Sequence, residues 1–315
     1  MITEENWNNM RIFSLSTFIR NLKILYSNML HIRKNSDLAL INQGRILSKL
    51  NSLESDWKIQ KYEFKVYSQW GDDGIIQFLV NKLKIVNRTF IEFGVEDFTE
   101  SNTRFLLIKD NWSGFVIDSS DKHIDKINRN ISNWKYDFKA HNEFITARNI
   151  NSILELSNFD KDLGLLSIDI DGNDFYILEA ITEYTPRILI CEYNSLFGDK
   201  RKITVPYQEN FSRTKFHFSN LFYGASLPAL NYISEIKGYK LVGTNSHGVN
   251  AYFVREDLIP KNFPDFTLEE VFTQRKFRES RDKNGKLDLL DIEVSIKSLK
   301  GNHVFNVENK ELEVF

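Results

Sequence analysis

Apolar residues recur at alternating intervals of three and four along the first part of the chain. The positions are Leu22, Leu25, Met29, Ile32, Ser36, Ala39, Gln43, Ile46, Leu50 and Leu53. Only Ser36 and Gln43 are polar, so the spacing predicts a long amphipathic helix within residues 1–60. That helix would either pack on the rest of its own chain or pair with a second copy in a homodimer. The polar cluster at residues 35–37 and Gly44 would also allow two helices joined by a turn.

After Asp56 the pattern changes to short apolar runs that alternate with helical stretches, which is typical of βα units and a mostly parallel sheet. The predicted strands are residues 89–95, 114–118, 143–146, 164–170, 187–192, 240–243 and 250–255. The predicted helices are residues 75–83, 101–109, 122–130, 147–156, 173–181 and 226–237. The loop between the last two strands is short, so these strands must be antiparallel. The pattern therefore predicts a Rossmann-like α/β fold whose seven-stranded, mostly parallel sheet has one antiparallel edge strand.

The sequence divides into three predicted parts. Residues 1–60 form the helical segment, residues 61–257 the α/β domain, and residues 258–315 a C-terminal α+β appendage. In the appendage the pattern predicts a helix at 268–278, a strand at 288–296 and a hairpin at 304–307 and 311–315.

Composition limits the classes of partner. The 41 Lys and Arg residues nearly balance the 43 Asp and Glu residues, which argues against a broad nucleic-acid surface. The single cysteine, Cys191, excludes an internal disulfide framework and a zinc site built from several thiolates, so any metal must have oxygen or histidine ligands. No apolar run is long enough for a membrane span, and the first thirty residues lack a signal-peptide layout. We therefore expect a cytoplasmic protein.

The first two predicted strands end in residues that could face a ligand, because ligands of open α/β sheets bind beyond the carboxyl ends of the strands. Gly94 allows close approach of the backbone, and Glu92 brings a carboxylate to the rim. Glu92 either faces a ligand ammonium or caps the next helix. Asp118 ends the second strand, about 25 residues after Gly94, where Rossmann-type sheets place a carboxylate on ribose hydroxyls. Asp118 could equally cap the segment that follows.

Two further strands end in a group of oxygen-bearing side chains. Asp169 and Asp171 follow one strand, and Glu192 and Asn194 follow the next. Because neighbouring strand ends converge, we expect Asp171, Glu192 and Asn194 to hold Mg²⁺, with Asp169 and Asp171 taking part in catalysis. The alternative is a set of helix caps and loop hydrogen bonds, with residues 171–173 as a plain turn.

Two loops complete the candidate site. His247, in the loop between the last two strands, is a candidate general base because imidazole titrates near neutral pH. Upstream, Ser68 and Gln69 belong to a polar segment with two glycines, residues 67–74. This segment could fold over a bound ligand as a lid, or simply cap the helix predicted to begin at residue 75.

Together these motifs resemble the FkbM-like group of class I S-adenosylmethionine-dependent methyltransferases. The resemblance spans residues 68–257 and is carried by the order and spacing of residues 68–76, 91–97, 100–104, 112–114, 167–174, 191–194, 224–227 and 248–255. It implies that Glu92, Gly94 and Glu96 border the methionine end of the cofactor and that Asp118 holds its ribose, with Ser68, Gln69 and Asp169 in the same site. The sequence departs from the pattern at Phe98, where similar sequences usually have glycine.

The resemblance implies methyl transfer from S-adenosylmethionine to a hydroxyl of a sugar or sugar-like molecule, in cell-surface polysaccharide biosynthesis. The acceptor would be a carbohydrate or nucleotide sugar, and Mg²⁺ would assist. A second hypothesis is a catalytically silent Rossmann-fold binding or scaffold module in which Phe98 blocks the cofactor. A transferase with a nucleotide donor is disfavoured, because the glycine-rich phosphate loop is absent.

Overall fold

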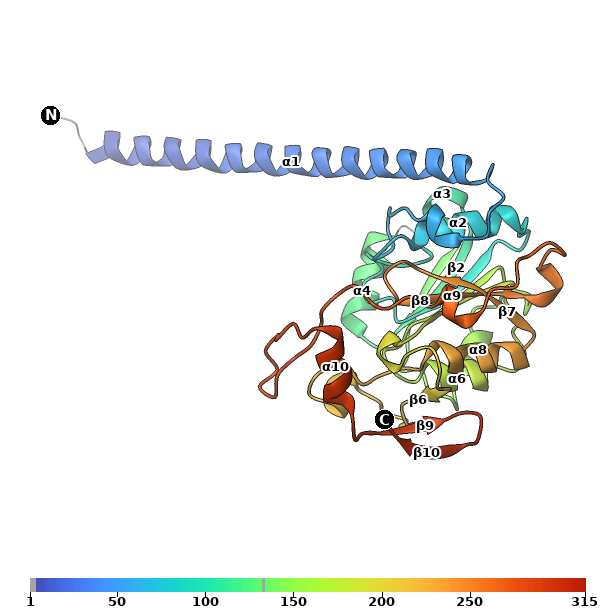
Figure 1. Cartoon of the computed structure of the whole chain (residues 1–315). Helices are drawn as coiled ribbons and strands as arrows, with labels where there is room; N and C mark the ends of the chain where they lie inside the picture. The colour runs from blue at the N-terminus through green and yellow to red at the C-terminus, as the bar shows by residue number, and fades with distance from the viewer. Residues whose placement is uncertain (1–3, 132–133) are drawn as a thin grey trace. The chain divides into compact units, whose positions relative to one another are not determined.

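The structure, a computed structural model, describes residues 4–131 and 134–315 (Figure 1). The chain forms two compact units, residues 1–46 and residues 47–315. This division groups residues 258–315 with the α/β domain, and the three predicted parts with their bounds at 60 and 257 stay predictions. Among the described residues, no helix combines the length and the apolar character that crossing a bilayer requires.

The N-terminal segment is one continuous helix, α1 (Glu4–Asn51). The turn considered at residues 35–37 and at Gly44 does not form. A single glycine inside a helix costs only about 1 kcal/mol relative to alanine, and the helical pattern on both sides continues without proline.

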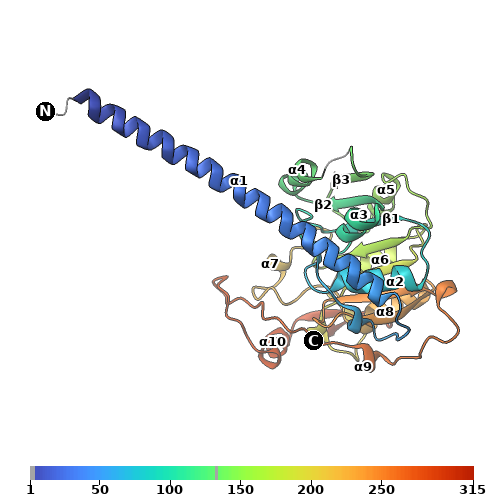
Figure 2. The ribbon, with the colours of Figure 1, turned by 90° about the horizontal axis from the view of Figure 1, so that it is seen from above.

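The larger unit contains a seven-stranded sheet in the order β3-β2-β1-β4-β5-β8-β7. Figure 2 labels three of these strands, β3, β2 and β1. The strands of the sheet are β1 (Thr89–Phe93), β2 (Ser113–Asp118), β3 (Phe138–Asn142), β4 (Leu165–Ile168), β5 (Ile188–Glu192), β7 (Tyr239–Thr244) and β8 (Asn250–Arg255). This is the strand order of class I methyltransferases, so the predicted fold class is confirmed. One detail differs from the prediction: the reversed strand, β8, lies between β5 and the edge strand β7 and pairs antiparallel with both.

Helices cover both faces of this sheet. The core on one face contains residues of α2 (Asp72–Lys82), α3 (Arg104–Asp110) and α4 (Asp121–Asn130). The core on the other face contains residues of α5 (Ile150–Glu155), α6 (Asp174–Ala180) and α8 (Leu227–Ile236). Successive strand residues alternate between the two cores, as Phe90 and Ile91 do, because side chains of a strand point to opposite faces.

The C-terminal residues pack through a second, three-stranded sheet in the order β10-β9-β6. Its strands are β6 (Ile203–Thr204), β9 (His303–Asn306) and β10 (Glu311–Val314), so the predicted hairpin is confirmed and its partner strand comes from the α/β domain. The remaining helices are α7 (Arg213–Phe216), α9 (Leu268–Val271), α10 (Ile292–Leu299) and the 3₁₀ turns η1 (Ile59–Tyr62), η2 (Ser195–Phe197) and η3 (Glu256–Leu258).

Three predicted elements were wrong. The strand expected at 143–146 lies at Phe138–Asn142, where only Phe138 and Ala140 carry the apolar alternation. The strand expected at 288–296 is largely replaced by α10, because Ser295 and Leu299 at helical spacing bury one face. The helix expected at 268–278 begins as predicted, with a capping box formed by Thr267 and Glu270 at its N-terminus, but it ends at Val271.

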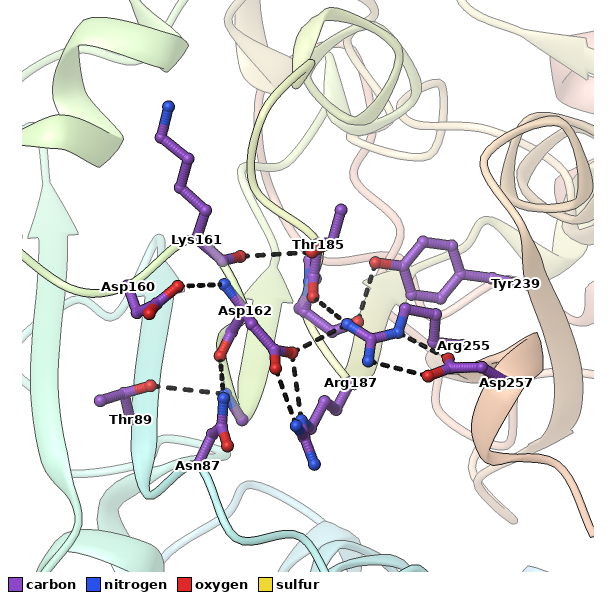
Figure 3. Close-up of polar contacts among 12 residues, drawn as sticks. Asn87, Thr89, Asp160, Lys161, Asp162, Thr185, Arg187, Tyr239, Arg255 and Asp257 are labelled. Carbon is purple, nitrogen blue, oxygen red and sulfur yellow. Dashed lines mark hydrogen bonds and ion pairs between the residues drawn. The ribbon is translucent and has the colours of Figure 1, made fainter.

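An ion cluster joins β4, β5 and β8 at the end of the sheet opposite the carboxyl ends of the parallel strands. Figure 3 shows Asp162 between Arg187 and Arg255, with Nη2 of Arg187 2.7 Å and Nη1 of Arg255 2.8 Å from its carboxylate oxygens. The Arg187 hydrogen bond, followed by that of Arg255, lowers the pKa of Asp162 to about 2 despite partial burial. The cluster links the reversed strand to the starts of β4 and β5. The candidate site lies at the opposite end of the sheet.

Candidate active site

A cavity of about 610 Å³ opens at the carboxyl ends of β1, β2, β4 and β5. It contains most of the residues expected from the sequence, namely Gln69, Glu92, Gly94, Glu96, Asp118, Asp169, Asp171 and Glu192. The structure thus brings these positions together, as the convergence of strand ends predicts. Their roles in binding and catalysis remain predictions.

Gly94 sets the shape of the cavity floor where the chain leaves β1. Its φ is +70°, and a Cβ atom built on it would lie 1.7 Å from the backbone oxygen of Asp169. Only glycine permits the loop after β1 to pass this close to the loop after β4.

Asp118 organises the end of β2. Its Oδ2 accepts a hydrogen bond from the backbone N–H of Glu96 at 2.9 Å, and its Oδ1 accepts one from Ser120 at 2.8 Å. The N-cap of α4 is Ser120 rather than Asp118. Asp118 therefore joins the loops after β1 and β2 while it lines the cavity.

Glu92 is buried, and both of its carboxylate oxygens are engaged. They accept hydrogen bonds from the backbone N–H groups of Asn102 and Thr103 and from the hydroxyls of Ser101 and Thr103. Burial raises the pKa of Glu92, and these hydrogen bonds oppose the rise. Of the two alternatives, the contacts seen are those of a carboxylate that caps the segment before α3.

Three carboxylates form a cluster on the cavity wall. Asp169, Asp171 and Glu192 each place one oxygen within 4.8 Å of the others. Among the described residues, Glu192 Oε2 is buried without a hydrogen-bond partner. Burial, followed by repulsion from the neighbouring aspartates, raises the pKa of both Asp169 and Glu192 well above their ordinary values.

Asp174 holds the turn that presents two of these carboxylates. Its side-chain oxygens accept hydrogen bonds from the backbone N–H groups of Ile170 and Gly172 at 2.9 and 3.0 Å. Burial raises the pKa of Asp174 to about 6. Asp171 itself has a φ of 58°, so the turn holds it in a left-handed conformation that is uncommon for a residue other than glycine.

Arg213 was not predicted as a site residue from the sequence. Among the described residues that line the cavity, it is the one with a positively charged side chain. Its Nη1 lies 2.8 Å from Asp171 Oδ1 and its Nη2 2.9 Å from Glu279 Oε2. Its guanidinium also lies 3.9 Å from the centre of the Tyr223 ring. No local motif marks Arg213, because it comes from a short helix, α7, outside the βα units.

Three predicted site residues lie elsewhere. Asn194 Oδ1 accepts a hydrogen bond from Leu196, and Asn194 Nδ2 donates to the carbonyls of Leu221 and Tyr223, so Asn194 caps η2 as the alternative reading allowed. Ser68 is fully buried and donates to Asp73. His247 does not line the cavity. Its ring stacks on Trp70, which does line the cavity, with centroids 4.2 Å apart, and its role as a general base stays a prediction.

The segment expected to form a lid is held by Asp73. Asp73 Oδ2 accepts hydrogen bonds from the consecutive backbone N–H groups of Val66, Tyr67 and Ser68 at 2.7–2.8 Å. Gln69 and Trp70, which follow directly, line the cavity. The loop is therefore fixed at its base while its tip faces the candidate site.

Phe98 does not line the cavity. It is buried against Phe138, with ring centroids 5.0 Å apart, and its φ of 60° lies in the region that favours glycine. This is a backbone conformation that glycine adopts more readily than phenylalanine. The hypothesis of a catalytically silent module supposed that the Phe98 side chain blocks the cofactor pocket. The side chain does not enter the cavity, so this steric argument does not hold.

Comparison with solved structures finds methyltransferases. The chain is similar to an S-adenosylmethionine-dependent methyltransferase from Clostridium acetobutylicum, with 9% identity over 68% of this chain and 98% of that one and a TM-score of 0.38. It is also similar to an O-methyltransferase family protein from Burkholderia thailandensis (11% identity, 58% of each chain, TM-score 0.34). A third is the N-terminal domain of EvdMO1 with SAH bound (9% identity, 60% of this chain and 81% of that one, TM-score 0.39).

No family model and no curated protein matches the sequence. Identities and TM-scores to the solved structures are low, so the fold assignment rests on the strand order itself.

Proposed function

We propose that the protein is an S-adenosylmethionine-dependent O-methyltransferase. The observation that carries the proposal is the placement of Asp118, at the end of β2, on the same cavity as the Gly94 turn after β1. In Rossmann-type sheets, an acid at this position accepts hydrogen bonds from ribose hydroxyls, and a close-packed glycine turn lets the cofactor approach the backbone. The residues present are therefore suited to this cofactor, which supplies an activated methyl group.

We further propose that the acceptor is a neutral sugar or sugar-like molecule of cell-surface polysaccharide biosynthesis. Aromatic side chains on the cavity wall, Trp70, Phe211 and Phe277, give it apolar surface that a sugar ring can contact. Polar atoms on the same wall are buried and have no hydrogen-bond partner among the described residues, namely Trp70 Nε1, Asn173 Oδ1 and Asn250 Oδ1. They are free to bond hydroxyl groups of a ligand.

The charge of the cavity favours a carbohydrate over a nucleotide sugar. Nine carboxylate side chains and one arginine line it. A diphosphate would meet repulsion from these carboxylates, whereas hydroxyl groups donate to them.

The carboxylate cluster supplies the proton acceptor for this chemistry. Asp169 lines the cavity, and its ionised carboxylate can accept the proton of the acceptor hydroxyl; because burial raises its pKa, it is a stronger base than an exposed aspartate. The hydroxyl oxygen then forms a bond to the methyl carbon as the carbon–sulfur bond breaks, which yields a methyl ether and S-adenosylhomocysteine. The protein aligns the two reactants and holds the proton.

We also propose a Mg²⁺ site formed by Asp171 and Glu192, without Asn194, which leaves Asp169 as the proton acceptor. Carboxylate oxygens are ligands that Mg²⁺ accepts, and the unpartnered Glu192 Oε2 leaves a buried acceptor for it. When bound, the ion would orient the acceptor hydroxyl and lower its pKa.

Calorimetric titration with S-adenosylhomocysteine tests the proposed function. We expect saturable binding to the wild-type chain, at least about tenfold weaker binding to Asp118→Ala, and unchanged binding to Asp121→Ala, an exposed aspartate three residues away. Transfer of a labelled methyl group to members of a saccharide library then tests the acceptor class. Absence of binding to the wild-type chain would show that the protein is not a methyltransferase.

A further inference from the structure

The helical unit exposes a continuous apolar face. Leu22, Leu25, Met29 and Ile32 of α1 are 48–66% exposed in the structure. Further exposed apolar side chains lie within this face or widen it on one side, namely Leu15, Phe18, Ile19, Tyr26, Leu30 and Leu40. A helix with so large an exposed apolar stripe needs a partner that covers it.

The polar face of the same helix is basic. Residues 15–46 contain five Lys and Arg residues and a single acid, Asp37, although the whole chain has a net charge of −2. Four of the five, Arg20, Lys23, Lys34 and Arg45, fall within an arc of about 60° when successive residues are turned by 100°. The centre of this basic arc lies roughly opposite the face that contains Leu22, Leu25, Met29 and Ile32.

This distribution favours a lipid surface over a second copy of the helix. Paired helices are oriented by opposite charges beside the apolar seam, and this segment has one acid to set against five bases. Its seam is also interrupted by Ser36 and Gln43. An apolar face backed by Lys and Arg is instead the composition of helices that lie in the interface of an anionic bilayer.

We propose that residues 15–46 of α1 form a membrane-surface helix that binds anionic lipid. The apolar face enters the boundary between headgroups and acyl chains, and the basic face remains among the lipid phosphates. The helix lies along the surface without spanning the bilayer, in agreement with its charge content. This inference concerns the helical unit and does not depend on the proposed enzyme activity.

Vesicle flotation with the full chain tests the proposal. One set of vesicles contains phosphatidylcholine alone, and the other contains phosphatidylcholine with about one third phosphatidylglycerol. We expect binding to the anionic vesicles only. A salt concentration of about 0.5 M, several times physiological ionic strength, should weaken this binding because salt screens the attraction between the basic residues and the lipid phosphates.

The decisive variant reverses the basic arc through Arg20→Glu, Lys23→Glu, Lys34→Glu and Arg45→Glu. It should lose at least about tenfold in vesicle binding, since each basic residue contributes to attraction by anionic lipid. The matched control reverses four exposed lysines of the larger unit, Lys122, Lys283, Lys286 and Lys300, and should bind as the wild type does.

Sedimentation equilibrium identifies the competing partner, and circular dichroism verifies that the variants stay helical. A wild-type chain that forms a stable dimer and ignores anionic vesicles would show that α1 pairs with a second copy, and the proposal would be wrong. Equal binding of the arc variant and the wild type would also overturn it.

Discussion

Arg213 and Asp171 form an ion pair at the candidate site, with 2.8 Å between Nη1 and Oδ1. The arginine side chain is 15% exposed and the aspartate 61%, so the pair joins a largely buried cation to the outermost carboxylate of the cluster. The same guanidinium contacts Glu279 from the C-terminal segment. Arg213 therefore links the turn after β4 to residues well outside the βα units, and it partly offsets the negative charge of the cluster.

Replacement of Arg213 by glutamine should shift the activity of the protein towards higher pH. Burial raises the pKa values of Asp169 and Glu192, and the positive charge of Arg213 opposes this rise. Loss of Arg213 should therefore raise both pKa values further. The proposed base must be deprotonated to act, and the acidic limb of the pH–rate profile should move upward with it. Arg148→Gln, at an arginine that is 81% exposed and paired with Glu209, serves as the control. An acidic limb that stays in place in Arg213→Gln would contradict this role.

The carboxylate cluster should bind a divalent cation in the absence of any acceptor. We expect saturable Mn²⁺ binding by calorimetry, at least about tenfold weaker in Glu192→Gln, because one charged ligand is lost. Glu269→Gln, at a glutamate that is 79% exposed, should bind as the wild type does.

Methyl transfer should stop on chelation and return with Mg²⁺, and full activity in excess chelator would reject a catalytic metal. Asp171→Ala should abolish transfer while the protein stays folded.

The sequence revealed the strand-end residues, because apolar runs locate parallel strands and the residues after them must share one rim. Gly94, Asp118, Asp169 and Glu192 meet at the cavity for this reason. Arg213 could not be found in this way, since its place depends on the path of a long connection after β5. The position of the His247 ring could not be predicted either, because the pattern places a loop but not the direction of a ring, which here stacks on Trp70.

Gly94→Ala should destabilise the protein strongly. Its Cβ would lie 1.7 Å from the carbonyl oxygen of Asp169, which is backbone and cannot move aside as a flexible side chain would. We expect a loss of about 3–5 kcal/mol in the free energy of unfolding, measured by urea denaturation. Gly238→Ala is the matched control, because Gly238 also has a positive φ, +78°, but nothing lies within 4 Å of the added carbon. Its cost should be about 1 kcal/mol, and equal losses in the two variants would refute the steric argument.

Asp73 should make the stability of the protein fall as pH rises from about 4 to about 6. Burial raises the pKa of Asp73 from 3.8 to about 6, even though backbone N–H groups of residues 66–68 stabilise the charged form. In this window the folded chain keeps a proton that the unfolded chain has released, so each increase in pH favours unfolding. Above about pH 6 the loss of stability is complete. It amounts to on the order of 3 kcal/mol, because the pKa rises from 3.8 to about 6 and each pH unit corresponds to about 1.4 kcal/mol.

Comparison with Asp73→Asn isolates this effect, because asparagine keeps an oxygen acceptor for the loop but does not titrate in this range. The difference in unfolding free energy between wild type and Asp73→Asn should move in favour of the variant between pH 4 and pH 7, values that bracket the window about the two pKa values. Asp174, whose pKa also rises to about 6, titrates in both proteins and cancels in the difference. Asp265→Asn, at an aspartate that is 94% exposed, should track the wild type at every pH. A pH-independent difference for Asp73→Asn would mean that Asp73 is ionised in the folded chain throughout, and that the three N–H groups outweigh its burial.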